Sequence, residues 1–159
     1  MPMTVLPGTG MFKNQMNLVR AHASNMEPAM FQIMASFHRI EQERFDNEGP
    51  AWEPLKDSTI IARGYLGYDA GPILQRDGVL MESFTGGGFS TNAFGPNFME
   101  VISHVEYAGY HQYGMGRNPV RKIIDITPNA LLLWREILQI YLATGVTGNI
   151  SDDAIAMAL

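Results

Sequence analysis

Residues 25–50 read NMEPAMFQIMASFHRIEQERFDNEGP and predict one long helix on which the rest of the fold depends. Asn25 can cap this helix, and Pro28 falls in its first turn, where the missing N–H of proline costs nothing. Apolar side chains then recur at helical spacing until Gly49 and Pro50 end the segment. The apolar residues, which predict one buried stripe, are Met30, Ile33, Met34, Phe37, Ile40 and Phe45.

A second long helix is predicted from Thr127 to Gly145. Pro128 stands at its first helical position, where proline is favoured, and Gly145 is a typical residue just past a helix end. The stripe expected to be buried consists of Leu131, Trp134, Leu138 and Tyr141.

Two short β-strands are predicted between the helices. Phe89–Phe94 and Phe98–Val105 flank the turn residues Gly95-Pro96-Asn97, a pattern typical of a β-hairpin. Lys122–Ile126 is predicted to add a further strand. We therefore expect an α+β fold in which a small antiparallel β-sheet is packed by two long helices.

The segment 51–88 interrupts this regular pattern with an irregular, Gly-rich insertion. It contains short helical pieces at about Ser58–Arg63 and Ile73–Phe84, which glycines separate. We expect this insertion to be extended and partly mobile.

The two ends of the chain are predicted to be flexible arms outside a core domain of residues 25–145. The N-terminal arm, residues 1–24, begins with an apolar run at Met3–Leu6 that can form an edge strand. It continues with a short amphipathic segment at Met11–Ala21. Residues 146–159 are expected to form a C-terminal tail, and both arms can clasp neighbouring copies.

Length and composition favour one compact domain. The chain has 159 residues, of which 46% are hydrophobic, enough to build a core. It has no cysteine, which excludes disulfides, thiolate nucleophiles and cysteine-based metal sites. It has neither a long apolar run nor the charged and apolar regions of a signal peptide, so we expect a soluble protein made in a cytoplasm, with no membrane partner.

The charge balance argues against a nucleic-acid-binding protein. Eleven basic residues stand against 16 acidic ones, for a formal net charge of −5. Proteins that grip phosphates carry the opposite excess. An acidic protein can still line a channel through which DNA passes without sticking.

No set of residues predicts catalysis, a cofactor or a metal. His38 and Glu41 lie three apart on the first helix, but two ligands are too few, and a solvated polar face is the simpler interpretation. No G-x-S-x-G motif is present. The glycines at 86–88 lack the following Gly-Lys-Ser/Thr of a phosphate loop, and Gly114-Met115-Gly116-Arg117 lacks the dinucleotide pattern.

Two aromatic segments have the composition of contact surfaces. In the first, Trp52 lies in a proline-rich loop, and it either contacts a neighbouring subunit or folds back as a lid on the core. The second segment, Tyr107–Gly114, holds three tyrosines, with a small basic patch beside it. Its alternative is an aromatic strand end packed within its own chain. The residues expected at a subunit or partner interface are Trp52, Leu55, Tyr107, Tyr110, His111, Gln112, Tyr113, Arg117 and Arg121.

Residues in the same segments follow a characteristic order between Phe37 and Ala143. They are Phe45, Glu48, Gly49, Trp52, Pro54, Leu55, Ser58, Thr59, Arg63, Ile73, Leu74, Gly78, Leu80, Ser83, Tyr107, Ala108, His111, Gln112, Gly114, Pro119, Val120 and Arg121. In this order they resemble the tailed-phage virion morphogenesis, or tail-completion, family. Asp77 and Lys122 depart from the pattern, since the family often has threonine and proline there.

The resemblance implies a structural virion protein without enzymatic activity or cofactors. Such a subunit is expected to form a homo-oligomeric ring, a hexamer, at the head–tail junction. The ring would complete the tail and dock it to the head while DNA passes through its lumen. The implied partners are other copies of the chain, the tail tube protein and the head connector or neck proteins.

Two alternatives remain open. A head-side adaptor or stopper ring would use the same kind of fold but bind portal-side proteins. A small hydrolase would need catalytic histidines, for which His104 and His111 are the candidates.

Overall fold

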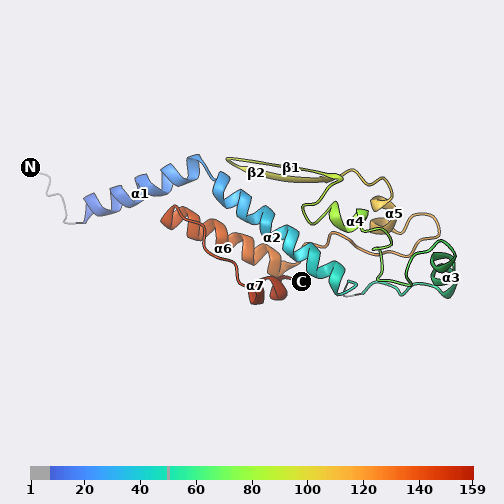
Figure 1. Ribbon diagram of the computed structural model, residues 1–159. Helices are drawn as coiled ribbons and strands as arrows, with labels where there is room; N and C mark the ends of the chain where they lie inside the picture. Colours follow the sequence, from blue (N-terminus) through green and yellow to red (C-terminus); the bar gives the residue numbers. More distant parts are fainter. Residues whose placement is uncertain (1–7, 50) are drawn as a thin grey trace, which may run out of the picture.

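The computed structural model describes residues 8–49 and 51–159, so the expected strand at Met3–Leu6 lies outside the described residues. The fold is α+β, as predicted, and Figure 1 shows an elongated molecule with α1 at one end and α3 at the other. The elements in chain order are α1 (Thr9–Ser24), α2 (Glu27–Asp46), α3 (Asp57–Tyr65), α4 (Val79–Glu82), β1 (Ser90–Gly95), β2 (Phe98–Ser103), α5 (Ala108–Tyr113), α6 (Pro128–Thr144) and α7 (Asp152–Ala158).

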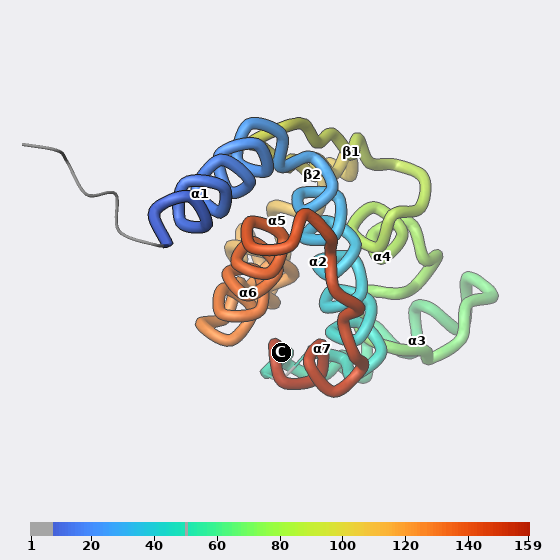
Figure 2. Tube along the Cα trace, turned by 90° about the vertical axis from the view of Figure 1, so that its left-hand side faces the viewer, coloured from blue at the N-terminus to red at the C-terminus, as the bar shows by residue number. Residues whose placement is uncertain are grey.

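Helix α2 is the central element, and it contacts both strands as well as α4, α6 and α7. In Figure 2 it runs between α6 and α7 on one side and the β-hairpin and α4 on the other. The predicted start is confirmed to within two residues, because the backbone N–H of Glu27 donates to Asn25 Oδ1 (3.1 Å) and Pro28 lies in the first turn. The predicted apolar stripe is buried from Ile33 to Phe45.

Glu41 corrects the expectation of a solvated polar face on α2. This carboxylate is buried and accepts a hydrogen bond from Arg44 Nε (3.2 Å), and Arg44 is itself buried. Arg44 Nη2 also donates to the carbonyl of Asp125 (2.8 Å). The segment that leads into α6 therefore covers this side of α2 and removes the pair from water.

Helix α6 begins and ends where the sequence predicts. Thr127 Oγ1 accepts a hydrogen bond from the N–H of Ala130 (3.0 Å), and Gly145 adopts the left-handed conformation with φ 74°. The predicted stripe is wrong at Leu131, which is 55% exposed. Ala130 and Ile137 are buried as well, and the predicted Trp134, Leu138 and Tyr141 pack inward.

The predicted β-hairpin is confirmed. Within the described residues, its two strands, β1 and β2, make up the β-sheet of the fold. Gly95 pairs with Phe98 across a two-residue turn, and the strands are antiparallel throughout. The strand predicted at Lys122–Ile126 is absent. The N–H groups of Ile123 and Ile124 both donate to Gln112 Oε1 (2.7 and 3.0 Å), and Gln112 Nε2 donates to the carbonyl of Ile124 (2.8 Å). A glutamine side chain thus takes the place of a neighbouring strand.

The two segments expected to be arms contain more helix than predicted, whereas the insertion contains less. Residues 9–24 form one continuous helix, whereas only 79–82 of the predicted piece 73–84 is α-helical. Residues 152–158 form α7, in which Ile155 and Ala158 are buried against α2 and α6. This part of the expected tail therefore belongs to the core.

Three hydrophobic clusters fill the interior of the described part of the chain. One, around Phe45, Leu80 and Ile123, underlies the α3–α5 end, and the other two lie between α2, α6 and α7. Trp134 packs against all three clusters, and its Nε1 donates to Ser36 Oγ (2.9 Å).

Candidate functional site

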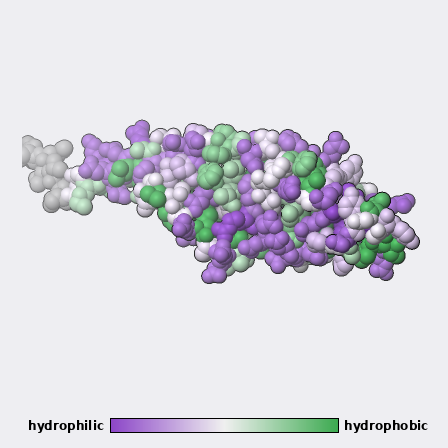
Figure 3. All heavy atoms as spheres, in the orientation of Figure 1, coloured by the Kyte–Doolittle hydropathy of each residue, from purple (hydrophilic) through white to green (hydrophobic). Residues whose placement is uncertain are grey.

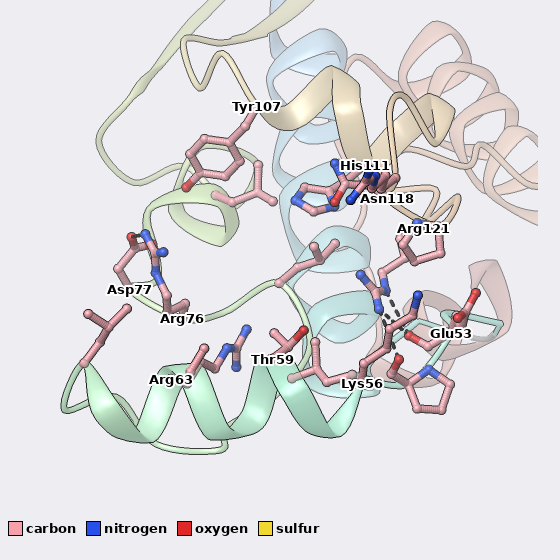
Figure 4. Close-up of a pocket in the computed structure, with 18 residues that line it drawn as sticks. Glu53, Lys56, Thr59, Arg63, Arg76, Asp77, Tyr107, His111, Asn118 and Arg121 are labelled. Carbon is pink, nitrogen blue, oxygen red and sulfur yellow. Dashed lines mark hydrogen bonds and ion pairs between the residues drawn. The ribbon is translucent and has the colours of Figure 1, made fainter.

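A cavity of about 460 Å³ lies at the end of the molecule opposite α1, between α3, α5 and the loops that flank them (Figure 4). We call it the basic pocket. Its charged lining residues are Glu53, Lys56, Arg63, Arg76, Asp77, Arg117 and Arg121. Five basic side chains therefore face two acidic ones, in a protein whose net charge is −5. Leucines and prolines from the same segments provide its apolar walls.

Helices α3 and α5 place the side chains on opposite walls of the basic pocket. α3 presents Thr59 and Arg63, one turn apart, from one wall. Tyr107 and His111 come from α5 and its N-cap on the other wall, and their rings meet edge to face with centroids 6.2 Å apart. The left-handed Gly114 ends α5 and turns the chain toward residues 117–121.

Arg121 is a buried cation that fastens the loop after α2. Its Nε and Nη2 donate to the carbonyl of Glu53 (2.9 and 2.6 Å), and Nη2 also reaches the carbonyl of Pro54 (3.3 Å). Burial lowers the pKa of Arg121, the nearby Glu53 carboxylate opposes this, and the charge of Arg63 lowers the pKa further. Arg121 forms no ion pair with any described residue.

Arg63 is a second buried cation with the same kind of partners. Its Nη1 donates to the carbonyls of Ala70, Gly71 and Pro72 (3.3, 3.4 and 3.2 Å) and closes the loop after α3. Within the described residues it too lacks a carboxylate partner. The two guanidinium groups are thus hydrogen-bonded to backbone oxygen atoms, but no carboxylate pairs with either charge.

His111 adds an unfilled hydrogen-bonding position to the pocket wall. Its Nδ1 is buried and has no hydrogen-bond partner in the described part of the chain. Burial lowers the pKa of His111, and Arg121 lowers it further, so the imidazole is neutral at neutral pH. Buried polar atoms of this kind are normally satisfied by a partner, a water molecule or a ligand.

The rim of the pocket carries one ion pair and one unpaired arginine. Arg76 Nη2 lies 3.0 Å from Asp77 Oδ2, and this hydrogen bond holds the pKa of the Asp77 carboxyl below its usual range. The Arg76 guanidinium also stacks 5.2 Å from the centre of the Tyr68 ring. Arg117 is exposed and has no ion-pair partner among the residues described.

The nine residues expected at an interface occupy three different environments. Leu55, Tyr107, His111, Arg117 and Arg121 line the basic pocket. Tyr110 and Tyr113 are exposed beside it, on α5. The other two, Trp52 and Gln112, point into the chain.

Trp52 folds back as a lid on the core, which is the second of the two positions that the sequence left open. It is buried against Phe45, with ring centroids 5.4 Å apart, and its Nε1 donates to the carbonyl of Lys122 (2.9 Å). Gly49 makes this approach possible, because a Cβ there would lie 2.4 Å from the indole.

Sequence reasoning did not select Lys56, Arg63 and Arg76 as members of a shared basic site. They lie at the N-cap of α3, on α3 and in the loop after it, far along the chain from Arg117 and Arg121. The helical spacing of Thr59 and Arg63 was the available signal, but it does not say which distant segment α3 faces.

Helix α1 forms a second candidate surface, because none of its residues is buried. Apolar side chains are exposed along it: Met11 (80%), Phe12 (70%), Met16 (51%) and Leu18 (51%). Its last turn contacts α6, where His22 Nδ1 lies 2.9 Å from the carbonyl of Leu142. Figure 3 shows apolar side chains at the surface near both ends of the molecule, over α1 and over α3.

Other sites show less organisation. His104 is exposed on the hairpin side, with Nε2 2.7 Å from Thr91 Oγ1, and it does not line the basic pocket. In residues 8–49 and 51–159 no group of three potential ligands is placed to hold a metal ion. No helix in the same ranges has the length and apolar character needed to cross a membrane.

Comparison with known proteins gives one match. The model of the phage virion morphogenesis family matches residues 9–143, which include every element from α1 to nearly the end of α6. No curated protein and no solved structure matches the chain.

Proposed function

The chain belongs to the phage virion morphogenesis family, and from this premise we propose that it is a non-enzymatic structural protein that forms a ring at the head–tail junction of a tailed phage. The ring completes the tail, docks it to the head and lets DNA pass through an acidic lumen. Its partners are other copies of the chain, the tail tube protein and the head connector.

The observation that carries the proposal is the exposed apolar face of α1. This helix has 16 residues and buries none of them, although helices in proteins gain most of their stability by packing an apolar face against a neighbour. Its exposed apolar face is what a contact with another copy would bury.

The charge distribution supports another copy as the partner of α1. Residues 1–24 contain two charged side chains, Lys13 and Arg20, which contribute +2. Since the whole chain carries −5, the remaining residues carry −7. A cationic helix from one copy is therefore attracted to the acidic body of the next.

Helix α6 offers an apolar surface for this contact. Its outward face exposes Leu131 (55%), Leu132 (50%) and Ile140 (39%). An α1 helix lying on α6 of the next copy joins two different surfaces, and such heterologous contacts close into rings when the rotation permits. The exposed Tyr110 and Tyr113, together with the other predicted interface residues on α5, remain available for tail or head proteins.

We propose termination by mismatch as the mechanism. A heterologous ring has two unequal faces, so one face can copy the contact between tail-tube rings while the other does not. Tube subunits then cannot add beyond it.

The test measures the native mass by light scattering, with negative-stain images of the same fraction. A closed ring of about six copies supports the terminator, whereas about twelve would favour the head-side adaptor. The double variant Phe12→Ser/Met16→Ser is expected to abolish the ring, and the matched variant Asn14→Ser/Asn17→Ser, on the exposed polar side of α1, is expected to keep it.

If the purified protein is monomeric, the measurement is repeated with tail tubes present, because the tube can act as the template. A protein that binds neither tail tubes nor head connectors in either state would refute the proposal.

A further inference from the structure

The basic pocket has the features of a site that lacks its anion. Arg63 and Arg121 are both nine-tenths buried, and both give their hydrogen bonds to backbone carbonyls rather than to a carboxylate. A buried charge is costly unless an opposite charge compensates it. Two cations lie close together here, since the charge of Arg63 lowers the pKa of Arg121, while the Glu53 carboxylate nearby raises this pKa without forming an ion pair.

The acidic residues of the pocket do not remove this excess. Asp77 is already paired with Arg76 at the rim. Glu53 contributes its carbonyl to Arg121, and its carboxylate is in no ion pair with a described residue. Lys56 and Arg117 add two further exposed cations without partners in the described ranges.

The walls indicate the kind of anion that fits. Leu55, Leu66, Leu74 and Leu80 give the cavity an apolar lining beneath the cations. Such a mixed lining suits a short apolar stem that ends in a carboxylate, as in aspartate or glutamate. Arginine binds carboxylates through paired hydrogen bonds, which adds geometric specificity.

We propose that the basic pocket binds an acidic segment of a partner protein, with an aspartate or glutamate carboxylate held among Arg63, His111, Arg117 and Arg121. His111 lines the same cavity, so its ring is placed to contact the bound segment.

The observations favour a protein segment over nucleic acid. The cavity holds about 460 Å³, which admits a side chain, whereas the phosphates of a duplex lie on the outside of a thick rod. The protein as a whole carries −5 and repels a polyanion at long range. A short acidic loop brings far less charge and can enter the cavity.

The test titrates the isotope-labelled full chain with the blocked peptide ADLEA and, as its neutral isostere, ANLQA. Saturable shifts of the His111 ring and of backbone amides around the pocket are expected with ADLEA. ANLQA is expected to bind at least about tenfold more weakly, because it forms no charge-assisted hydrogen bonds.

Two variants locate the site. Arg117→Gln, at an exposed position, is expected to weaken ADLEA binding by about threefold to tenfold without disturbing the fold. The matched control Lys122→Gln makes the same charge change one residue beyond Arg121, at a lysine whose amine lies 3.8 Å from Asp125 outside the pocket, and it is expected to keep the affinity. Arg63→Gln is a second probe, provided that its amide spectrum stays dispersed.

Equal binding of ADLEA and ANLQA, or equal losses in Arg117→Gln and Lys122→Gln, would overturn the proposal. Tighter binding of a short DNA duplex than of ADLEA at the same residues would overturn it in favour of a nucleic-acid contact. The inference does not depend on the ring, because the pocket lies within one chain. If the protein is a monomer and still binds ADLEA, the proposed binding of an acidic segment holds even though the proposed function fails.

Discussion

At the scale of single residues, the indole of Trp52 packs so closely on Gly49 that this position requires glycine. Its φ is +64°, and a Cβ would lie 2.4 Å from the indole of Trp52. We expect Gly49→Ala to lower the free energy of unfolding by about 2–4 kcal/mol, because Trp52 must shift away from Phe45. Urea denaturation measures this change.

Gly64 provides the matched control for this substitution. It lies inside α3, and a Cβ there meets no atom within 4 Å. Gly64→Ala is expected to be neutral or to stabilise the protein by up to about 1 kcal/mol. If both variants had the same stability, close packing of Trp52 would not be the reason for glycine at position 49.

The buried Glu41 makes stability depend on pH. Burial raises the pKa of its carboxyl to about 7 from an ordinary 4.5, although Arg44 pulls it down. Between these values the folded protein keeps a proton that the unfolded chain has lost. The free energy of unfolding therefore falls as pH rises through this window, by up to about 3 kcal/mol, and levels off above it.

Glu41→Gln is expected to remove this slope, because the amide does not titrate. Thermal or urea unfolding between pH 4.5 and 7.5 measures whether the slope is lost. This range spans the ordinary pKa of 4.5 and the raised pKa of about 7. Glu43→Gln removes a carboxylate from the same helix outside the core and should keep the wild-type slope. A wild-type protein whose stability rises across this window would contradict the prediction.

At the scale of elements, α7 acts as a structural part of the core. Ile155 is completely buried in a cluster with Ile40 and Ala130. We expect Ile155→Ala to cost about 2–5 kcal/mol, since the cavity cannot close fully. Met157→Ala, at a position that is 72% exposed on the same helix, should change stability by less than about 0.5 kcal/mol. Denaturant midpoints of the two variants separate these outcomes.

The elements that the sequence predicts correctly have local signals. α2 and α6 have an apolar repeat together with end signals such as Thr127 and Gly145, all within one helix. The hairpin has its turn between two short apolar runs. The wrong face at Leu131 arises because residues 131–133 are three consecutive leucines, so the repeat does not distinguish neighbouring faces.

The elements that the sequence misses depend on distant partners. Residues 122–126 have the composition of a strand, but the side chain of Gln112 occupies their hydrogen-bonding groups. The basic pocket is missed for the same reason. Tyr107, His111 and Arg121 could be selected as a local aromatic and basic segment, whereas Arg63 joins them only through the fold.

At the scale of the whole molecule, Trp134 joins the two ends. It packs against all three hydrophobic clusters, so none of them loosens without disturbing this indole. We expect one cooperative unfolding transition despite the elongated shape. Far-UV circular dichroism and tryptophan fluorescence, recorded at one protein concentration, should therefore give superimposable urea curves.

Trp134→Phe is the variant that tests this coupling, because Trp52 then reports on the α3–α5 end alone. Its fluorescence transition is expected to separate from the transition seen by circular dichroism. If the two curves still coincide, the clusters are coupled by other contacts.

The position of the basic pocket, at the end of the molecule opposite α1, has a consequence for avidity (Figure 1). The proposed contact through α1 would leave the pocket of every copy free, so the proposed ring would display several identical pockets together. Each pocket can bind weakly, but once one is occupied its neighbours meet their ligands at a high effective concentration. An array of this kind would hold an acidic partner firmly, whereas a single copy would release it and would not block partner surfaces before assembly.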